Sequence, residues 1–348
     1  MNKDIEYIAY TDQYRSSLLA LLGHIWTDLS IDEIDKKFAW RYENNYCLRE
    51  NTTFIAVKDG IVIGFRGFAA VNYFFNGLRR TVLIPCDAIV DPGYRREGVF
   101  SALTEMSLRT LSEKYDQLGL SVYLNLSSNE KSTPGNIKIG WRVFSPKCYY
   151  TKICLGNILS LIKHHNREEN CGTYGNKEYC ITIDTAIDLS ILRQIKHYVK
   201  YPITRDRSDE YYQWRYVDSL GKFLFAVLKE QGRPSAYLIL EKVNTAHYSI
   251  LDYAANSQHA LYKAFKLASR SLKIIVYRLF IVGGADEEIK SLMRNGFFKE
   301  SSFVARLRRK KKYPALMKDV RLIEGDGKIN NIELMNPTNW RLLKGDSH

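Results

Sequence analysis

The stretch that decides the fold is Asp91-Pro92-Gly93-Tyr94-Arg95-Arg96-Glu97-Gly98-Val99-Phe100, which joins a strand-like apolar run at residues 83–90 to a helix-like run. The backbone N–H groups at the start of a helix have no intrahelical partner, and the helix dipole adds partial positive charge there. The glycine at position 98 allows a ligand to approach this backbone closely. The strand, the basic turn and the helix start therefore predict a cradle for an anion such as a diphosphate.

The order of residues in this turn, R-x-x-G-x-F after a strand that ends in V-D-P, resembles the pyrophosphate loop of the GNAT superfamily of acyl-CoA N-acyltransferases. The usual pattern is Q/R-x-x-G-x-G/A, so Phe100 departs from it, although a subset of the superfamily carries R-x-x-G-x-F-S. The alternative is a basic glycine turn that binds nothing. The resemblance implies contacts with the diphosphate of acyl-CoA from Arg95, Arg96, Gly98, Val99, Phe100 and Ser101.

A second element supports the resemblance, because Gly140 follows Asn129 at the interval of the superfamily pattern N-x-x-A-x-x-x-Y-x-x-x-G-F. The resemblance implies that Asn129 and Ser132 contact the pantetheine arm, whose amides a side-chain amide can bond. The alternative is an N-cap and a C-cap without a ligand. The loop and this helix together predict a GNAT fold for residues 1 to about 155.

The helix of this second element departs from the family at the general acid. Family members often have a tyrosine there, whose hydroxyl protonates the leaving thiolate, whereas this chain has Asn136. An amide cannot act as an acid. The sequence therefore leaves the general acid open between Ser132, Tyr149 and Tyr150, and each of these also suits a structural role.

The strand before the loop carries the remaining chemistry that the resemblance implies. Main-chain N–H groups around Ile89 and Val90 would hold the pantetheine arm and polarise the thioester carbonyl, which is oxyanion stabilisation by preorganised dipoles. Asp87 is the candidate base that accepts the proton of the attacking amine. The alternative for Asp87 is a carboxylate that only pairs with a nearby arginine.

Composition limits the remaining classes of protein. The chain has 348 residues, of which 45% are hydrophobic and 26% charged, a balance typical of globular folds. At roughly 100 to 200 residues per domain, the length predicts two domains. The first residues carry no apolar signal core, and no apolar run approaches the length that crosses a bilayer. We therefore expect a cytoplasmic protein without a membrane span.

The cysteines, histidines and charges narrow the possible partners. The six cysteines form no C-x-x-C pair and the seven histidines are scattered, so we expect reduced thiols and no metal site. The formal net charge of +13 favours anionic partners such as CoA or nucleotide-linked sugars. We interpret the densest basic run, residues 306–312, as the solvated end of a strand, and we expect no nucleic-acid partner.

The predicted elements repeat along the chain. Residues 1–160 predict a GNAT domain, residues 161–177 a polar linker, residues 178–312 a second cycle, and residues 313–348 a tail that packs on the domains. The fold class is α/β of the α+β kind. We expect two tandem GNAT-like domains, each a mixed, mostly antiparallel twisted sheet flanked by helices.

A short repeated motif relates the two cycles to each other. Trp214-Arg215-Tyr216 repeats Trp40-Arg41-Tyr42, each before a predicted hairpin, which suggests a duplication. The second cycle is degenerate, since residues 254–258 lack the Arg-x-x-Gly turn, and we expect it to build an interface or a wall of the acceptor cleft. Residues 340–347 resemble the W-x-x-x-x-G-D-S ending of tandem GNAT-like proteins found with bacterial surface-polysaccharide genes.

The resemblance thus implies an N-acyltransferase, with acetyl-CoA as the expected donor, that transfers its acyl group directly to an amine of a small polar acceptor such as a nucleotide-linked amino sugar. One alternative is a Fem-type transferase, which takes an aminoacyl group from tRNA, although the first domains of such enzymes lack a working CoA loop. Another alternative is a catalytically inactive protein that binds acyl-CoA. The acyl length, the acceptor and the oligomeric state stay open at this point.

Overall fold

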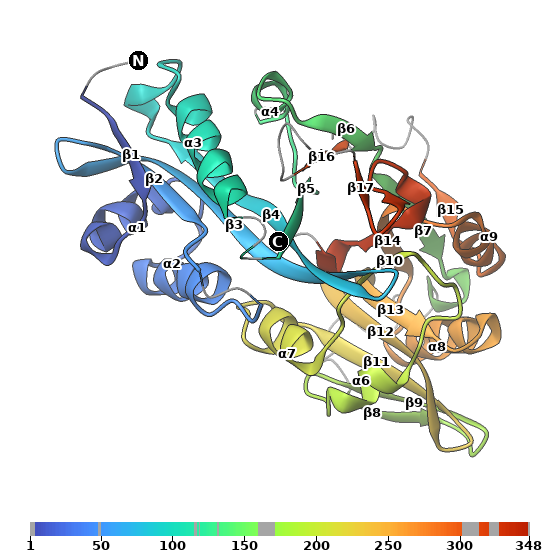
Figure 1. Ribbon diagram of the computed structural model, residues 1–348. Helices are drawn as coiled ribbons and strands as arrows, with labels where there is room; N and C mark the ends of the chain where they lie inside the picture. Colours follow the sequence, from blue (N-terminus) through green and yellow to red (C-terminus); the bar gives the residue numbers. More distant parts are fainter. Residues whose placement is uncertain are drawn as a thin grey trace.

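The computed structural model of the protein describes residues 4–47, 50–114, 117, 119–130, 132–158, 171–300, 313–319 and 327–346. Its elements form two large sheets in an elongated molecule, with the first sheet at one end and the second at the other (Figure 1). The predicted basic run at residues 306–312 lies outside the described residues.

The first sheet has the strand order β1-β2-β3-β4-β5-β16-β6, and β10 pairs with the C-terminal end of β3. Its strands are antiparallel except for the parallel pair β4 and β5. Two hairpin turns, at Asp59-Gly60 and Asn76-Gly77, have positive φ at both central residues, as two-residue hairpins require. The strands are β1 (Glu6–Ala9), β2 (Thr53–Lys58), β3 (Ile61–Phe75), β4 (Leu78–Val90), β5 (Leu120–Asn125), β6 (Arg142–Ser145), β10 (Ile203–Arg205) and β16 (Ala315–Asp319).

Helices cover both faces of the first sheet (Figure 1). The helices α1 (Arg15–Gly23) and α2 (Ile31–Phe38) pack on one face, and α3 (Val99–Glu113) packs on the other. A capping box between Ser30 and Glu33 fixes the start of α2. The short helix α4 (Thr133–Lys138) follows β5. We call the two sides of this sheet the α2 face and the α3 face.

The second sheet has the order β15-β7-β14-β13-β12-β11-β9-β8, and β19 pairs with β14. The helices α8 (Gln258–Ser271) and α9 (Asp286–Arg294) pack in one core with it, whereas α6 (Ser190–Gln194) and α7 (Asp209–Tyr212) join the core between the halves. The strands are β7 (Cys148–Ile153), β8 (Gly172–Gly175), β9 (Tyr179–Asp184), β11 (Leu224–Glu230), β12 (Arg233–Asn244), β13 (His247–Ala255), β14 (Val276–Gly283), β15 (Phe298–Lys299) and β19 (Arg341–Leu343). A small hairpin, β17 (Lys328–Ile329) with β18 (Ile332–Glu333), stands apart.

The two halves exchange one strand each. β7 comes from the predicted first domain but lies in the second sheet, between β14 and β15. β16 comes from the predicted tail but lies at the matching place in the first sheet, between β5 and β6. The predicted fold class is confirmed, with two mixed, mostly antiparallel sheets flanked by helices. Because strands cross between the sheets, the division at residues 160 and 178 stays a proposal about the folding units.

Both sheets contain a parallel pair of strands that separates toward one end. β4 and β5 pair from Thr81 to Leu83, and β4 then continues toward Val90 paired with β3 but not with β5. β13 and β14 separate in the same way after Ile250. In the second half, β19 pairs with the end of β14, and Arg341 Nη2 donates to Tyr253 O of β13 at 2.8 Å. The tail therefore fills the second gap with its own backbone.

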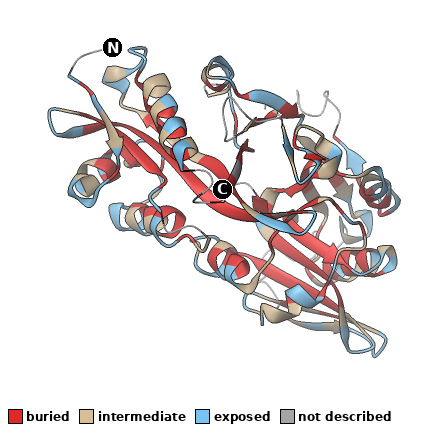
Figure 2. Cartoon of the chain, in the orientation of Figure 1, coloured by how far each residue is buried: buried red, intermediate tan, exposed pale blue. Residues whose placement is uncertain are grey.

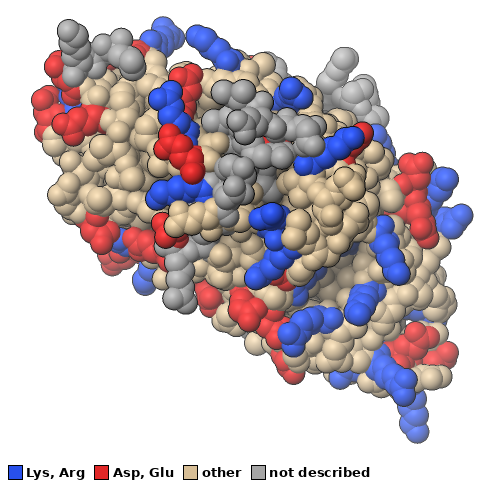
Figure 3. Space-filling model, in the orientation of Figure 1, with Lys and Arg blue, Asp and Glu red and all other residues tan. Residues whose placement is uncertain are grey.

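Buried residues follow the strands of both sheets (Figure 2), and one continuous core joins the halves. On the face seen in Figure 3, Lys and Arg side chains are spread out with Asp and Glu among them. None of the described helices combines the length and the apolar character needed to span a membrane.

Candidate active site

The predicted anion cradle lies at the start of α3. Gly98 caps the helix with a φ of 83°, in the left-handed region that favours glycine. The first bond of the helix runs from Ala102 N to Gly98 O at 3.0 Å. The N–H groups of Val99, Phe100 and Ser101 therefore precede the first intrahelical donor and are available to a ligand.

The basic turn before α3 is held by local contacts. Asp91 Oδ1 accepts from Gly93 N at 2.8 Å, which stabilises the short helical turn Pro92–Tyr94. Arg95 Nε donates to Val90 O at 3.2 Å, so the side chain of Arg95 bends back along the strand end. Arg95, Arg96 and Gly98 are exposed. The turn thus presents a preformed, positively charged loop to solvent.

Asp87 lies on the α2 face of the first sheet, where two side chains bond its Oδ2. Arg41 Nη1 donates at 2.6 Å and the Tyr42 hydroxyl donates at 2.7 Å. Burial, and next the charge of Asp87, raise the pKa of Tyr42 well above its usual value. The register between β3 and β4 shifts next to Gly67, where a Cβ atom would lie 2.4 Å from Tyr42 Cζ. This β-bulge and this glycine make room for the contacts of Asp87.

Arg66, on β3, is a buried cation on the opposite, α3 face. Its guanidinium lies 4.9 Å from the ring centre of Phe68 and 5.9 Å from that of Phe100. Its Nε and Nη2 have no hydrogen-bond partner among the described residues, and burial lowers its pKa to about 10. A buried donor without a partner is costly, so this guanidinium is suited to bind a ligand oxygen.

The second sequence element forms the start of α4. Asn129 Oδ1 accepts from Ser132 N at 3.0 Å, and Ser132 Oγ accepts from Asn129 N at 3.2 Å. Asn136 is fully buried, and neither amide atom of its side chain has a partner among the described residues. A Cβ atom on Gly135 would lie 2.9 Å from Phe100 Cε1, so the Phe100 ring packs directly on α4.

These residues fit the acyl-CoA that the sequence resemblance implies. The free helix N–H groups and the basic turn suit a diphosphate. The side-chain atoms of Arg66 and Asn136 that find no partner within the described ranges supply donors and an acceptor for amide and carbonyl groups. Phe100, where the resemblance leads one to expect glycine or alanine, lies beside Arg66 and packs on Gly135, the neighbour of Asn136.

Sequence reasoning missed Lys147, which lies between β6 and β7. Its Nζ donates to Ser128 O at 3.0 Å and to Ser128 Oγ at 3.1 Å, and burial lowers its pKa to about 8. The neighbouring Ser127 Oγ contacts Pro85 O of β4 at 3.5 Å, so this cluster lies beside the gap between β4 and β5. Sequence reasoning also missed Arg66 as a site residue, because an arginine inside an apolar strand gives no motif.

Tyr149, a candidate acid, and Cys86, the cysteine nearest to the candidate base in sequence, both have structural contacts. Tyr149 belongs to β7 in the second sheet, where its ring lies 4.3 Å from the Arg278 guanidinium carbon, and burial raises its pKa. Cys86 Sγ contacts Ile84 O at 3.2 Å, and burial raises the pKa of this thiol to about 11. Cys86 is therefore a neutral thiol near neutral pH.

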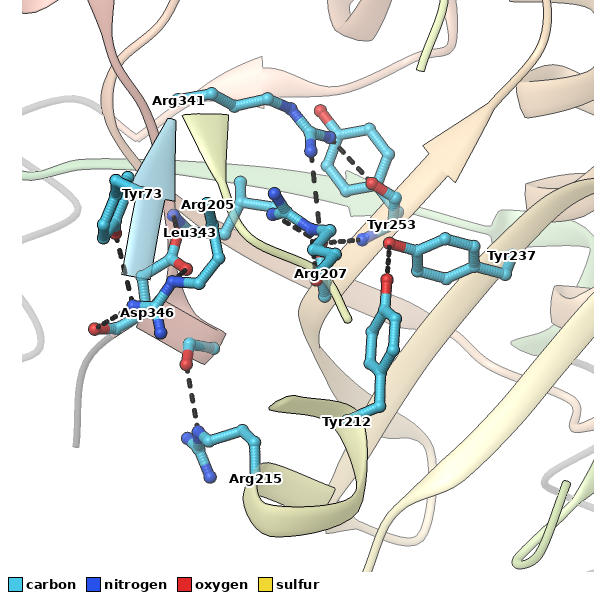
Figure 4. Close-up of polar contacts among 12 residues, drawn as sticks. Tyr73, Arg205, Arg207, Tyr212, Arg215, Tyr237, Tyr253, Arg341, Leu343 and Asp346 are labelled. Carbon is cyan, nitrogen blue, oxygen red and sulfur yellow. Dashed lines mark hydrogen bonds and ion pairs between the residues drawn. The ribbon is translucent and has the colours of Figure 1, made fainter. Parts of the chain in front are cut away.

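The tail motif is built into the core between the halves (Figure 4). Asp346 Oδ1 pairs with Arg205 Nε at 2.7 Å, and Asp346 Oδ2 accepts from Leu343 N at 2.7 Å. Arg215 Nε donates to Gly345 O at 3.0 Å. A Cβ atom on Gly345 would lie 2.3 Å from the Tyr216 hydroxyl. The G-D part of the W-x-x-x-x-G-D-S ending is thus explained by packing.

The second half has no comparable cradle among its described residues. Ser257 caps α8 and accepts from Ala260 N at 3.0 Å, so the helix start is satisfied by its own side chain. Asp252 occupies the place on β13 that Asp87 has on β4, but Arg207 binds both of its oxygens, at 2.8 and 3.1 Å. The second half therefore lacks the donor features of the first.

Comparisons agree with this architecture. No protein-family model and no curated protein matches the chain. A solved structure from Enterococcus faecalis, of unknown function and called a probable N-acyltransferase, matches with a TM-score of 0.63 and 12% identity, over 91% of this chain and 73% of that one. A GCN5-related N-acetyltransferase from Anabaena variabilis matches with a TM-score of 0.59, 12% identity and the same coverages, 91% and 73%.

A third solved structure has two domains of the same kind. A tandem GNAT protein from the clavulanic acid biosynthesis pathway matches with a TM-score of 0.51 and 11% identity, over 91% of this chain and 98% of that one. At such identities the likeness concerns the fold alone. The chain has the tandem GNAT fold.

Proposed function

We propose that the protein is an acyl-CoA-dependent N-acyltransferase whose donor site is the first half. One observation carries this proposal: the free N–H groups at the start of α3 lie on one face of the first sheet, Asp87 lies on the other, and β4 and β5 separate between them. Such an arrangement suits transfer through the sheet, with the donor on the α3 face and the acceptor on the α2 face.

On the donor side, the residues from Arg95 to Ser101 hold the diphosphate, and Asn129 and Ser132 border the pantetheine arm. Acyl-CoA supplies an activated thioester, with acetyl-CoA as the expected donor. The N–H groups around Ile89 and Val90 polarise its carbonyl, and Arg66 adds a positive charge beside the arm. Phe100 closes the space between α3 and α4 against water.

On the acceptor side, Asp87 accepts the proton of the attacking amine. Arg41 and Tyr42 each donate a hydrogen bond to Oδ2 and so orient its carboxylate. The nitrogen of the amine forms a bond to the acyl carbon while the bond from that carbon to the CoA sulfur breaks. The acceptor is a small polar amine, for which a nucleotide-linked amino sugar in the cytoplasm is our candidate.

We place the proton donor for the leaving thiolate at Lys147. Its pKa of about 8 is close to that of a thiol, so proton transfer between them is nearly balanced. Ser132 and Tyr149 stay predictions for this role. The Ser132 hydroxyl already accepts a bond from Asn129 N, and Tyr149 packs on Arg278, so we favour the lysine.

The test is calorimetric titration of the protein with acetyl-CoA and with CoA. We compare the wild type with an Arg95→Glu, Gly98→Glu double variant, whose added negative charge lies in the cradle. A Gln231→Glu, Arg233→Glu double variant changes the net charge equally on an exposed hairpin of the second half and serves as the matched control.

We expect binding by the wild type and the control, and its loss in the cradle variant. Absence of binding by the wild type would overturn the acyltransferase proposal and move the Fem-type, tRNA-dependent reading ahead of it. Tight binding of acetyl-CoA without acyl transfer to any amine would instead support the inactive binding protein.

A further inference from the structure

A cavity of about 340 Å³ lies where the two halves meet on the α2 face. Trp40 and Arg41 line it from the first half, and Arg215 lines it from the second. The two repeated W-R-Y motifs therefore bring their arginines to one cavity. The donor site on the α3 face does not account for this cavity.

The cavity is strongly cationic. Lys37, Arg41, Arg215 and Lys344 line it, and among the described lining residues Glu241 is the single carboxylate. Glu241 pairs with Lys344 and Arg41 pairs with Asp87, while Lys37, Arg41 and Arg215 line the same space. Burial, and next the charge of Arg41, lower the pKa of Lys37, and the charge of Asp87 raises it. Such a site favours an anion, because mutual repulsion of partly buried cations is relieved on binding.

Apolar side chains form the rest of the wall, among them Leu29, Leu220, Phe223 and Leu251. A second cavity of about 620 Å³ shares Gly221 and Phe223 with the first and carries two more cations, Lys222 and Lys242. The ligand that fits this pair of cavities has an oxyanion at one end and an apolar or planar body.

The cavity adjoins the candidate base through Arg41. The same guanidinium lines the cavity and donates from Nη1 to Asp87 Oδ2 at 2.6 Å, while its Nε has no partner among the described residues. A ligand whose oxyanion reaches this guanidinium therefore lies next to Asp87 on the acceptor face. Neither the donor loop nor α3 contributes to the cavity walls.

We propose that this cavity is the acceptor site, and that it selects an amine whose body carries a phosphate or a carboxylate. The proposal rests on the proposed function for the identity of the ligand as an acceptor. The oxyanion binds among Lys37, Arg41 and Arg215, and the body of the ligand packs on Trp40 and Phe223. The charge of the acceptor, rather than its size alone, is thus the feature that the two halves recognise together.

Three probes with the same aromatic amine test the proposal by calorimetry: 4-aminophenyl phosphate, 4-aminobenzoate and the neutral 4-aminobenzamide. The variant is Lys37→Glu, which reverses one charge of the cavity without touching Asp87. Lys36→Glu, on an exposed residue of the same helix, is the matched control. Acetyl-CoA is titrated into all three proteins in parallel.

We expect at least one anionic probe to bind at least tenfold more tightly than the amide, and Lys37→Glu to abolish that preference while Lys36→Glu keeps it. A stronger phosphate or a stronger carboxylate response identifies which oxyanion the acceptor carries. Equal binding of all three probes, or an unchanged preference in Lys37→Glu, overturns the proposal. Absence of acetyl-CoA binding by the wild type would overturn the proposed function alone, because the probe titrations are carried out without acetyl-CoA.

Discussion

Trp40 and Trp214 form a reciprocal pair at the centre of the molecule. Trp40 Nε1 donates to Trp214 O at 2.6 Å, and Trp214 Nε1 donates to Trp40 O at 2.8 Å. Their rings stack with centroids 5.3 Å apart and an interplanar angle of 23°. Each tryptophan lies in a π-helical turn, Ala39–Glu43 or Gln213–Val217, directly after a helix. The two repeats therefore meet through equivalent residues, as a duplicated chain with local two-fold symmetry would.

The first prediction concerns this pair. Trp40→Phe keeps a ring in the stack but removes the donor to Trp214 O, and Trp214→Phe does the same in reverse. A buried carbonyl without its partner costs about 1–3 kcal/mol, so each variant should lower the free energy of unfolding by that amount. Denaturant unfolding of both single variants and the double variant measures the coupling. Losses below about 0.5 kcal/mol in both single variants, the range of ordinary surface changes, would contradict an anchoring role.

The W-R-Y repeat shows what the sequence could and could not predict. Local patterns were sufficient for the loop, because Gly98 and the helix start are contiguous in the chain. They were also sufficient for the duplication, because three identical residues precede each hairpin. They were insufficient for the pairing itself, since 174 positions separate Trp40 from Trp214 and only the folded chain joins them.

The strand exchange escaped prediction for a related reason. β7 and β16 are short, and each reads equally well as the last strand of its own half or of the other. Tertiary packing makes the choice: Leu316 of β16 enters the core under α3, and Tyr150 of β7 enters the core of the second sheet. The sequence suggested an arginine partner for Asp87 as an alternative, but not which one, because Arg41 and Tyr42 reach it from another element.

The second prediction concerns the buried pair of Arg41 and Asp87. Asp87→Leu leaves a buried guanidinium without its carboxylate, which costs about 3–5 kcal/mol. In the Arg41→Met, Asp87→Leu double variant no charge is stranded, so its stability should exceed that of Asp87→Leu. Thermal and denaturant unfolding compare four proteins: the wild type, the single variants Asp87→Leu and Arg41→Met, and the double variant. A double variant less stable than both single variants would show that the pair is not coupled through its charges.

The third prediction concerns Arg66, whose buried guanidinium has two donors without a hydrogen-bond partner in the described part of the chain. Arg66→Met removes an uncompensated buried charge and keeps most of the packing on Phe68, so the free protein should gain on the order of 1–2 kcal/mol of stability. The same change should weaken acetyl-CoA binding, because the donor site loses its cation. Arg233→Met, at an exposed arginine, is the control and should change neither quantity. Reduced stability together with unchanged acetyl-CoA affinity would assign Arg66 a purely structural role.

The fourth prediction concerns the pH dependence that Lys147 introduces. Burial lowers its pKa from 10.5 to about 8 in the folded protein, whereas the unfolded chain keeps the ordinary value. Between these two values the unfolded state binds one more proton than the folded state, so the contribution of Lys147 to stability rises with pH over this window. Below pH 8 both states are protonated and the contribution is constant at its least favourable level. Because tyrosines titrate in the same range, the quantity to measure is the difference in unfolding free energy between the wild type and Lys147→Met. That difference should increase from pH 8 to pH 10.

In parallel, NMR of reductively ¹³C-methylated lysines should show a resonance that titrates near pH 8 and is missing from Lys147→Met. If the wild-type resonance that is absent from Lys147→Met instead titrates above pH 10, Lys147 is fully charged near neutral pH. Its assignment as a proton donor with a pKa close to that of a thiol would then be wrong.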